Sequence, residues 1–321
     1  MRTFLLATLG YFVIAVVLSL LLYPDPSLVT DRLQAVSSER IGFLKSTVIW
    51  FLPVALIGPF LCGRGGAVGE SLLAAAGCIQ LQAGFSLTKT LIPLVLPFYA
   101  DPTLARLDRA LHGGVDPWVA LHGATDPDFV LALVPVYLQV WIVPAMALPV
   151  FIVATDDNRA RRDRYTILFL FCWVFLGNVL AVLAASVGPV FYDSLIGGSR
   201  FAALTEALAR SGIRSSIVGQ IQDYLWTSYQ AQTMAPASGI SAFPSVHVAI
   251  ATLTALYLGE RRIYWLPVGI LFVATTLFLS VYTGYHYAID GYFSIAAVVG
   301  LWAWLRHRER AVGAQENYAA D

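Results

Sequence analysis

Charged residues are scarce in this sequence. Only 12% of the 321 residues are Asp, Glu, Lys or Arg, whereas soluble domains carry about a quarter. The 20 basic residues balance 20 acidic ones, so there is no excess positive charge to bind nucleic acid, and we expect no nucleic-acid partner. Hydrophobic residues make up 58% of the chain, which indicates burial in a lipid bilayer rather than in a soluble core.

Metal-binding patterns are also missing. Cys62, Cys78 and Cys172 all fall inside apolar runs without the spacing of metal ligands, so we interpret them as small apolar side chains. The sequence has no pair of histidines four residues apart on a helix. It therefore predicts neither a metal site nor another cofactor.

Long apolar runs are abundant. A bilayer core about 30 Å thick is crossed by a helix of roughly 20 apolar residues. The candidate spans lie at residues 4–22, 47–62, 69–88, 130–153, 166–187, 243–259, 263–283 and 288–305. The first run is longer than a typical secretory signal core and lacks a cleavage site, so we interpret it as an uncleaved span. The predicted fold is an all-α, polytopic membrane helix bundle with about eight spans.

The distribution of basic residues predicts the orientation. With a cytoplasmic N-terminus, eleven of the twenty lie in short inner segments: Arg2, Arg64, Arg159, Arg161, Arg162, Arg164, Arg261, Arg262, Arg306, Arg308 and Arg310. The others are spread over three longer outer connections, 23–46, 89–129 and 188–242. The positive-inside rule therefore places both termini in the cytoplasm. The low cysteine content and the abundance of Arg and Ala favour a bacterial inner membrane.

Two short segments carry residues that indicate chemistry. SAFPSVHVA (241–249) places His247 at the outer start of the sixth span, and YTGYHYAID (282–290) places His286 between the seventh and eighth. Both imidazoles are therefore expected at the same depth, on the same side of the membrane. Asp290 follows His286 by four residues, so the two side chains share one face if the helix continues through both.

These residue types fit phosphoryl transfer. A carboxylate beside a histidine fixes its tautomer and leaves the other ring nitrogen as a nucleophile, the roles that we assign to Asp290 and His286. A second histidine opposite can protonate the leaving oxygen, which makes His247 the general acid. The helix N-termini that carry these residues direct amide groups toward an anion.

The same segments carry a family resemblance. FPSVH (243–247) and HYAID (286–290) resemble the second and third motifs of the type 2 phosphatidic acid phosphatase superfamily. The resemblance implies a metal-independent enzyme that forms a phosphohistidine, with the roles assigned above.

The resemblance also implies a domain organisation. The superfamily has a six-helix catalytic core, which we place in residues 66–310 of a single integral membrane domain. Two N-terminal spans in 1–65 precede this core, and we expect a frayed tail in 311–321.

Three positions depart from the superfamily pattern. Val246 stands where most of its phosphatases have glycine, and Ser280 stands where they have arginine. The first motif is matched by Lys89 but not by its arginine, which is Leu96 here. The pattern without arginines is similar to the inositol phosphorylceramide synthase branch, whose members move a phosphorylated head group from a phospholipid to ceramide. The GPVFYD segment (188–193) also resembles that branch.

A phosphate site without these arginines needs cations from elsewhere. The candidate phosphate or substrate contacts are Lys89, Ser245, Arg106, Arg109, His112 and Tyr282. Most of these residues also have a simpler explanation without a phosphate. Lys89 could extend from its helix end to the membrane interface, and Arg106, Arg109 and His112 could belong to a solvated loop helix. Tyr282 could be part of a belt of aromatic residues at the interface.

The preferred function is a lipid phosphotransferase acting at the outer, periplasmic or lumenal, face. It takes a phosphoryl or phosphorylated head group from a phospholipid donor and transfers it to a lipid alcohol. The alternative is hydrolysis of a lipid phosphate, such as phosphatidate or a polyprenyl pyrophosphate. Hydrolysis shares the first half-reaction and uses water as the acceptor, and the sequence does not decide between the two reactions. A transporter or lipid-binding protein would distribute ionisable residues through its spans, whereas here they gather at one face.

Overall fold

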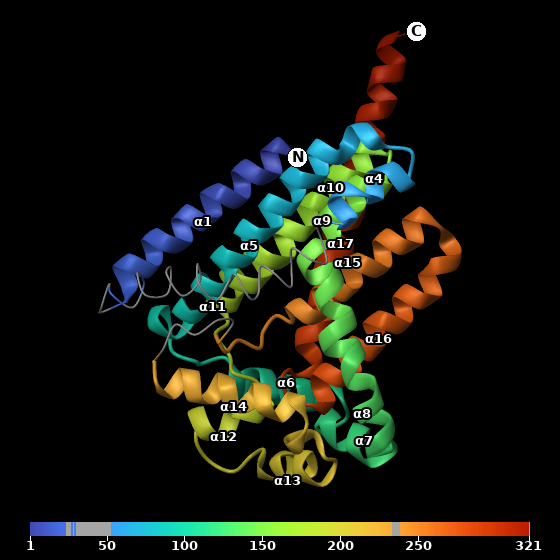
Figure 1. Cartoon of the computed structure of the whole chain (residues 1–321). Helices are drawn as coiled ribbons and strands as arrows, with labels where there is room; N and C mark the ends of the chain where they lie inside the picture. Colours follow the sequence, from blue (N-terminus) through green and yellow to red (C-terminus); the bar gives the residue numbers. More distant parts are fainter. Residues whose placement is uncertain (24–26, 28, 30–52, 233–237, 321) are drawn as a thin grey trace.

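The computed structural model describes residues 1–23, 27, 29, 53–232 and 238–320 (Figure 1). Helices and their connecting loops make up these residues, and no strand occurs among them. The all-α prediction is therefore confirmed.

Within the described residues, six helical stretches are long and apolar enough to cross a membrane. They are Arg2–Leu22, Gly65–Val95, Pro127–Thr155, Arg159–Leu183, Ile263–Tyr282 and Ala288–Val312. Each coincides with a predicted span, and the chain is therefore an integral, multi-pass membrane protein.

The other two predicted spans are not among these six. Residues 47–62 lie partly outside the described residues, which include the short helix α4 (Gly58–Leu61) there. Residues 243–259 correspond to α15 (Val246–Arg261), whose 16 residues rise only about 24 Å. The helix starts late because Ser245 occupies its N-cap position directly after Pro244.

The spanning stretches combine regular helices with tighter or wider turns. In chain order these elements are α1 (Arg2–Leu22), η1 (Gly65–Ala67), α5 (Val68–Val95), α8 (Pro127–Pro135), η2 (Val136–Val140), α9 (Trp141–Thr155), α10 (Arg159–Leu170), η3 (Phe171–Leu180), α11 (Ala181–Leu183), η5 (Ile263–Trp265), α16 (Leu266–Tyr282) and α17 (Ala288–Ala320). Both η2 and η3 are π-helical segments, which occur frequently at functional sites.

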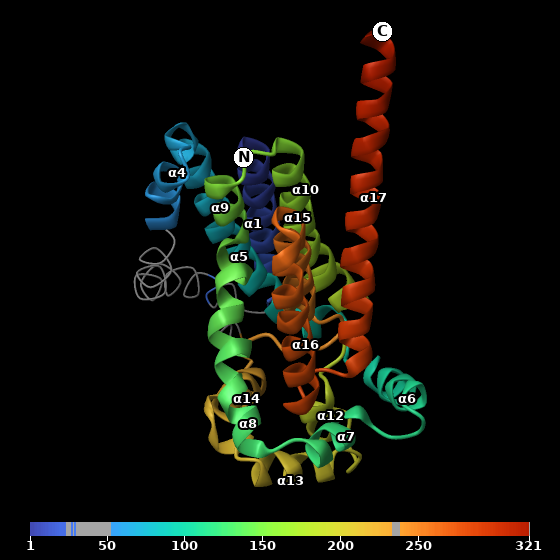
Figure 2. The same cartoon turned by 90° about the vertical axis from the view of Figure 1, so that its right-hand side faces the viewer.

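Shorter helices connect the spans at one end of the bundle. They are α6 (Asp101–Leu111), α7 (Pro117–Ala124), α12 (Pro189–Leu195), α13 (Ala202–Arg210), η4 (Ile213–Ser215) and α14 (Ile217–Gln230). Figure 1 shows both chain termini at the opposite end. Helix α17 stays helical through residues 311–320, where a frayed tail was predicted, and extends past the bundle (Figure 2).

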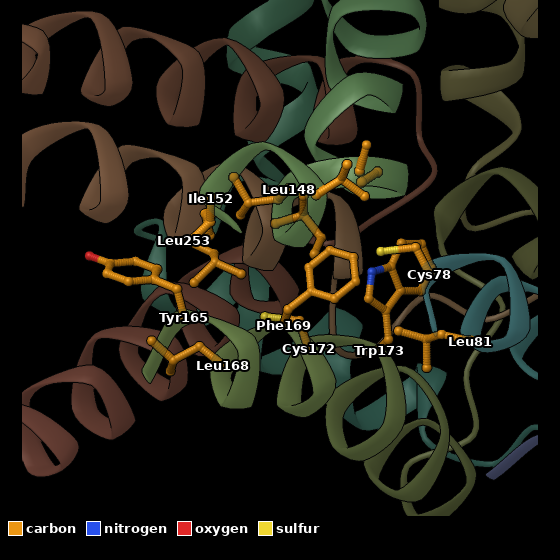
Figure 3. Close-up of a cluster of buried hydrophobic side chains, with 14 of the residues drawn as sticks. Cys78, Leu81, Leu148, Ile152, Tyr165, Leu168, Phe169, Cys172, Trp173 and Leu253 are labelled. Carbon is orange, nitrogen blue, oxygen red and sulfur yellow. The ribbon is translucent and has the colours of Figure 1, made fainter. Parts of the chain in front are cut away.

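The central core lies between α5, α9, α10, η3 and α15 (Figure 3). Phe169 and Trp173 pack there against aliphatic side chains such as Leu253. Cys78 and Cys172 are buried in this cluster, as expected for small apolar side chains, whereas Cys62 is exposed.

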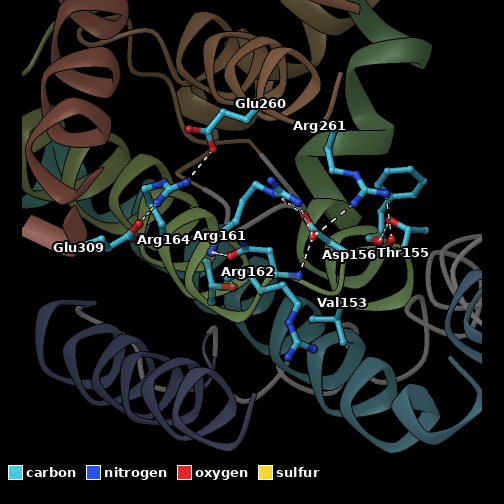
Figure 4. A network of polar contacts seen from close by, with 12 residues as sticks. Val153, Thr155, Asp156, Arg161, Arg162, Arg164, Glu260, Arg261 and Glu309 are labelled. Carbon is cyan, nitrogen blue, oxygen red and sulfur yellow. Dashed lines mark hydrogen bonds and ion pairs between the residues drawn. The ribbon is translucent and has the colours of Figure 1, made fainter. Parts of the chain in front are cut away.

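Ion pairs join the helices at the end of the bundle that carries the termini (Figure 4). The buried Asp156 accepts hydrogen bonds from Arg161 at 2.6 and 2.7 Å. Burial is the largest single effect and raises the pKa of Asp156, but the hydrogen bonds from Arg161 and the Asn158 amide and the charges of Arg161 and Arg261 together outweigh it, so the pKa lies below its usual value. Arg164 pairs with Glu260 on α15 and Glu309 on α17, which connects α10 to both helices.

Candidate active site

His247 projects from the first turn of α15. Ser245 caps this helix, since its Oγ accepts a hydrogen bond from the Val248 amide at 3.4 Å. The His247 ring stacks on Trp141 and Tyr137, with ring centroids 4.0 and 4.7 Å apart. The Trp141 indole also donates to the His247 carbonyl oxygen at 2.9 Å. These contacts fix the plane of the imidazole.

His286 lies in the turn between α16 and α17 rather than on a continuing helix. Its amide donates to the Ser280 carbonyl oxygen at 3.1 Å. Its Nδ1 lies 3.4 Å from Oδ2 of Asp290, which is fully buried. The same Oδ2 accepts a hydrogen bond from the Tyr287 amide at 3.0 Å. The structure therefore brings the predicted histidine and aspartate together, although only Asp290 is helical.

Both histidines line one cavity of about 590 Å³. Their ring centroids are 6.2 Å apart, which places both imidazoles within reach of one phosphate group. The rest of the wall is mostly apolar, with Ile79, Leu138, Ile142, Met146, Phe191 and Ile240 among its residues. A site of this kind suits a ligand that is apolar over most of its length and polar at one end.

Lys89 is the predicted cation that reaches this cavity. It lies near the end of α5 and lines the wall, with Nζ 5.9 Å from the centre of the Phe85 ring. The loop before α15 packs closely on the Lys89 backbone, because a Cβ on Gly239 would lie 2.6 Å from the Lys89 carbonyl group. Gly239 therefore permits the contact that brings Lys89 beside the loop leading to His247.

Ser245 and Tyr282 are close in sequence to the histidines but do not line the cavity. The Ser245 hydroxyl is buried and caps α15. The Tyr282 ring is fully buried and stacks on His122 with ring centroids 3.7 Å apart. Both side chains therefore stabilise the segments around the site and do not face the cavity.

The three predicted contacts on α6 and at its C-cap lie away from the cavity wall. Arg106 and Arg109 are exposed and bond locally, Arg106 to the Thr103 hydroxyl at 3.2 Å and Arg109 to the Gly114 carbonyl at 2.6 Å. The ring of His112 bonds to the carbonyl oxygen of Asp108, one helical turn back, at 2.6 Å and to a tyrosine hydroxyl on α17 at 3.0 Å. Helix α6 directs these groups outward because its opposite face is buried.

Ser280, at the position of the missing arginine, is fully buried. Its Oγ lies 2.8 Å from the Thr276 carbonyl oxygen and 3.3 Å from the Tyr137 hydroxyl. Since Tyr137 stacks on His247, Ser280 belongs to the packing behind the general-acid candidate.

Trp141 and Tyr137 are site residues that the sequence does not reveal. They lie in an apolar span in which aromatic residues are expected in any case. Only the fold shows that this span meets His247, which is more than a hundred positions away. Among the described residues, no group of three His, Cys, Asp or Glu side chains could hold a metal ion.

Comparison with known proteins finds one family match. A profile described as the PAP2 superfamily matches residues 102–305, which is more than half of the chain. The matched region contains His247, His286 and Asp290, while Lys89 and the α5 wall of the cavity lie before it. No curated protein and no solved structure matches the chain. Because this family profile matches residues 102–305, the chain belongs to the PAP2 superfamily.

Proposed function

We propose that the protein is a lipid phosphotransferase that moves a phosphoryl or phosphorylated head group from a phospholipid to a lipid alcohol. The observation that carries the proposal is that His247 and His286 line one mostly apolar cavity, with the buried Asp290 3.4 Å behind His286. Membership of the PAP2 superfamily supports phosphatase or phosphotransferase chemistry on a phosphorylated lipid.

In the first half-reaction, the free ring nitrogen of His286 attacks phosphorus. The bond between phosphorus and the donor's alkoxide oxygen breaks, and protonated His247 gives its proton to that oxygen. The first product leaves as an alcohol, and the phosphoryl or phosphorylated head group stays on His286. Asp290, 3.4 Å from Nδ1, stabilises the positive charge that develops on the His286 ring.

In the second half-reaction, the acceptor hydroxyl attacks the phosphohistidine. Its proton passes to His247, and the bond between phosphorus and nitrogen breaks. Both histidines return to their starting protonation states, so the cycle consumes no co-reactant. The neutral form of His247 acts as the base in this step.

The shape of the cavity supports a lipid substrate. Its wall runs along α5 from Lys89 to Ile79, ten residues or about 15 Å at the rise of an α-helix. The opposite side runs along the Pro127–Thr155 stretch from Tyr137 to Met146. A hydrocarbon chain placed here has its polar end beside the histidines and its apolar part inside the bundle.

The same wall favours transfer over hydrolysis. Apart from Lys89 and the histidines, the residues lining the cavity carry no charge. An apolar wall of this kind stabilises an acceptor lipid and offers few hydrogen bonds to hold attacking water. The buried Ser280, in place of an arginine, also resembles the transferase branch of the superfamily more than its phosphatases.

The proposal places the chemistry at the end of the bundle opposite both termini. The short helices α6, α7, α12, α13 and α14 gather at that end (Figure 1). If both termini are cytoplasmic, the site lies at the periplasmic or lumenal face, and basic residues at the other end follow the positive-inside rule.

Lys89→Met is expected to weaken phosphate binding, because it removes the charge while keeping an unbranched side chain. A charge-assisted hydrogen bond contributes about 1.5–3 kcal/mol, so we expect kcat/KM to fall about 10- to 100-fold. Steady-state kinetics on the purified variant measure this effect. Arg210→Gln is the matched control, since Arg210 is an exposed cation on α13. Unchanged kcat/KM in Lys89→Met would remove Lys89 from the phosphate site.

The proposed function is tested with purified protein in detergent and isotope-labelled phosphatidylinositol. The donor is incubated alone, with ceramide or with diacylglycerol, and released and transferred phosphate are followed by mass spectrometry. We expect a phosphorylated acceptor lipid that forms only when the acceptor is present. Free phosphate or inositol phosphate in the same amount with and without acceptor would show hydrolysis instead.

A further inference from the structure

The inward face of α6 carries two buried carboxylates. Asp101 is fully buried and Asp108 is 4% exposed, and they share this face with Leu104 and Ala105. Burial raises the pKa of both carboxyls, whereas hydrogen bonds from backbone amides act in the opposite direction. Burying a carboxylate destabilises the fold unless the group is hydrogen-bonded. The hydrogen-bond partners of Asp101 and Asp108 therefore indicate which segments these side chains position.

Asp101 joins two segments of the site. Its Oδ2 accepts the Val187 amide at 2.8 Å, and its Oδ1 accepts the Gly188 amide at 3.0 Å. The Tyr287 hydroxyl also donates to Oδ1, at 2.9 Å. Tyr287 is the residue after His286, and its amide bonds to Asp290. One carboxylate therefore holds the 187–188 backbone and the neighbour of the candidate nucleophile.

Asp108 caps the start of α17 from another helix. Its Oδ2 accepts the Ala288 amide at 3.2 Å, and its Oδ1 accepts the Ile289 amide at 3.0 Å. These are amides of the first turn, which have no partner within their own helix. Since Asp290 lies in the same turn, Asp108 fixes the helix end that aims Asp290 at His286.

Residues 186–190 connect this end to the other histidine. The amides of Ala242 and Phe243 bond to the Ser186 carbonyl and hydroxyl oxygens, each at 2.9 Å. The Val190 amide bonds to the Gly284 carbonyl oxygen at 2.9 Å. Segment 186–190 therefore lies between the residues that lead to His247 and those that lead to His286.

Gly188 shows how closely this segment approaches the site. Its φ is +82°, and a Cβ there would lie 2.3 Å from the Tyr285 carbonyl oxygen, one residue before His286. Any other residue would displace the segment from the turn that carries the candidate nucleophile.

We propose that Asp101 and Asp108 are positioning residues, which set the separation and orientation of His247 and His286 through segment 186–190 and the start of α17. The inference rests on the proposed function. Neither carboxylate lines the cavity, so both act through the backbone that they hold. Reacting groups displaced by about 1 Å lose about 100-fold in rate, so a loosened hold lowers kcat while leaving the binding of the lipid chain intact.

Asp101→Asn and Asp108→Asn test this assignment. Asparagine replaces one of the two carboxylate oxygens by an NH2 group, which donates hydrogen bonds but does not accept them. Each variant therefore loses one of the two backbone amides that its carboxylate accepts, while the side chain keeps its shape. We expect kcat to fall about 100-fold, with KM little changed. Tyr287→Phe removes only the hydroxyl bond to Asp101 and is expected to give a smaller fall in kcat. The matched control is Asp128→Asn, an exposed acid on α8, with wild-type kcat.

Hydrogen exchange measured by mass spectrometry supplies a readout that does not need turnover. We expect faster exchange in peptides covering 186–190 and 284–290 of the two asparagine variants, and no change at the other end of the bundle. Full kcat in both variants, or a lower melting temperature with unchanged kcat per folded molecule, would overturn the inference. If the wild-type protein turns over no lipid, the proposed function fails. Hydrogen exchange alone then decides whether the two carboxylates hold these segments, and unchanged exchange in the variants would overturn the inference.

Discussion

His286→Ala is expected to abolish turnover of any phospholipid donor, with kcat lowered by at least about 10⁴-fold. The alanine removes the ring nitrogen that forms the bond to phosphorus in the proposed mechanism. Product formation by mass spectrometry, normalised to folded protein, measures the loss. The substitution leaves the helices intact, because His286 lies in a turn between α16 and α17.

His307→Ala is the matched control for this experiment. His307 is exposed on α17, far along the helix from the site, and its removal is expected to leave kcat unchanged. Turnover retained in His286→Ala would exclude this histidine as the nucleophile and with it the covalent mechanism proposed above.

His247→Ala is expected to slow transfer from a natural phospholipid by about 10²- to 10⁴-fold, the usual contribution of a general acid. The alkoxide that leaves a phospholipid is a strong base and needs a proton. A donor with a nitrophenol leaving group does not, so the first half-reaction is expected to recover with such a donor. Release of nitrophenol in a single turnover measures this recovery.

The comparison between the two donors separates chemistry from packing. His247 stacks on Trp141 and Tyr137, so the alanine also removes contacts from the cavity wall. A wall defect slows both donors equally, whereas loss of a proton donor slows only the natural one. Equal slowing of both would contradict the general-acid role.

The sequence predicts the parts of this protein that depend on local patterns. Long apolar runs give the spanning helices, because helix length is tied to membrane thickness. The spacing of four residues between His286 and Asp290 brings them together even though the helix starts only at Ala288, and the Tyr287 amide between them also donates to Asp290. His247 and His286 meet because their segments end at the same side of the bundle.

Features that depend on contacts between distant segments could not be predicted in this way. Helix α6 carries charges on both faces. The sequence offered Arg106 and Arg109 as candidate phosphate contacts, whereas the structure buries Asp101 and Asp108. Which face turns inward depends on backbone amides that are supplied by residues some 80 to 180 positions away. The burial of Tyr282 could not be predicted either, because its ring is covered by His122, which lies 160 positions away in the sequence.

The most direct test of the covalent mechanism is identification of the phosphorylated residue. Purified protein is mixed with labelled donor lipid, quenched with base within the first turnover, digested and analysed by mass spectrometry. The mechanism predicts a phosphoryl or phosphorylated head group on His286, lost on acid treatment and on addition of an acceptor alcohol. Modification of another residue, or a burst of product without any modified peptide, would contradict it.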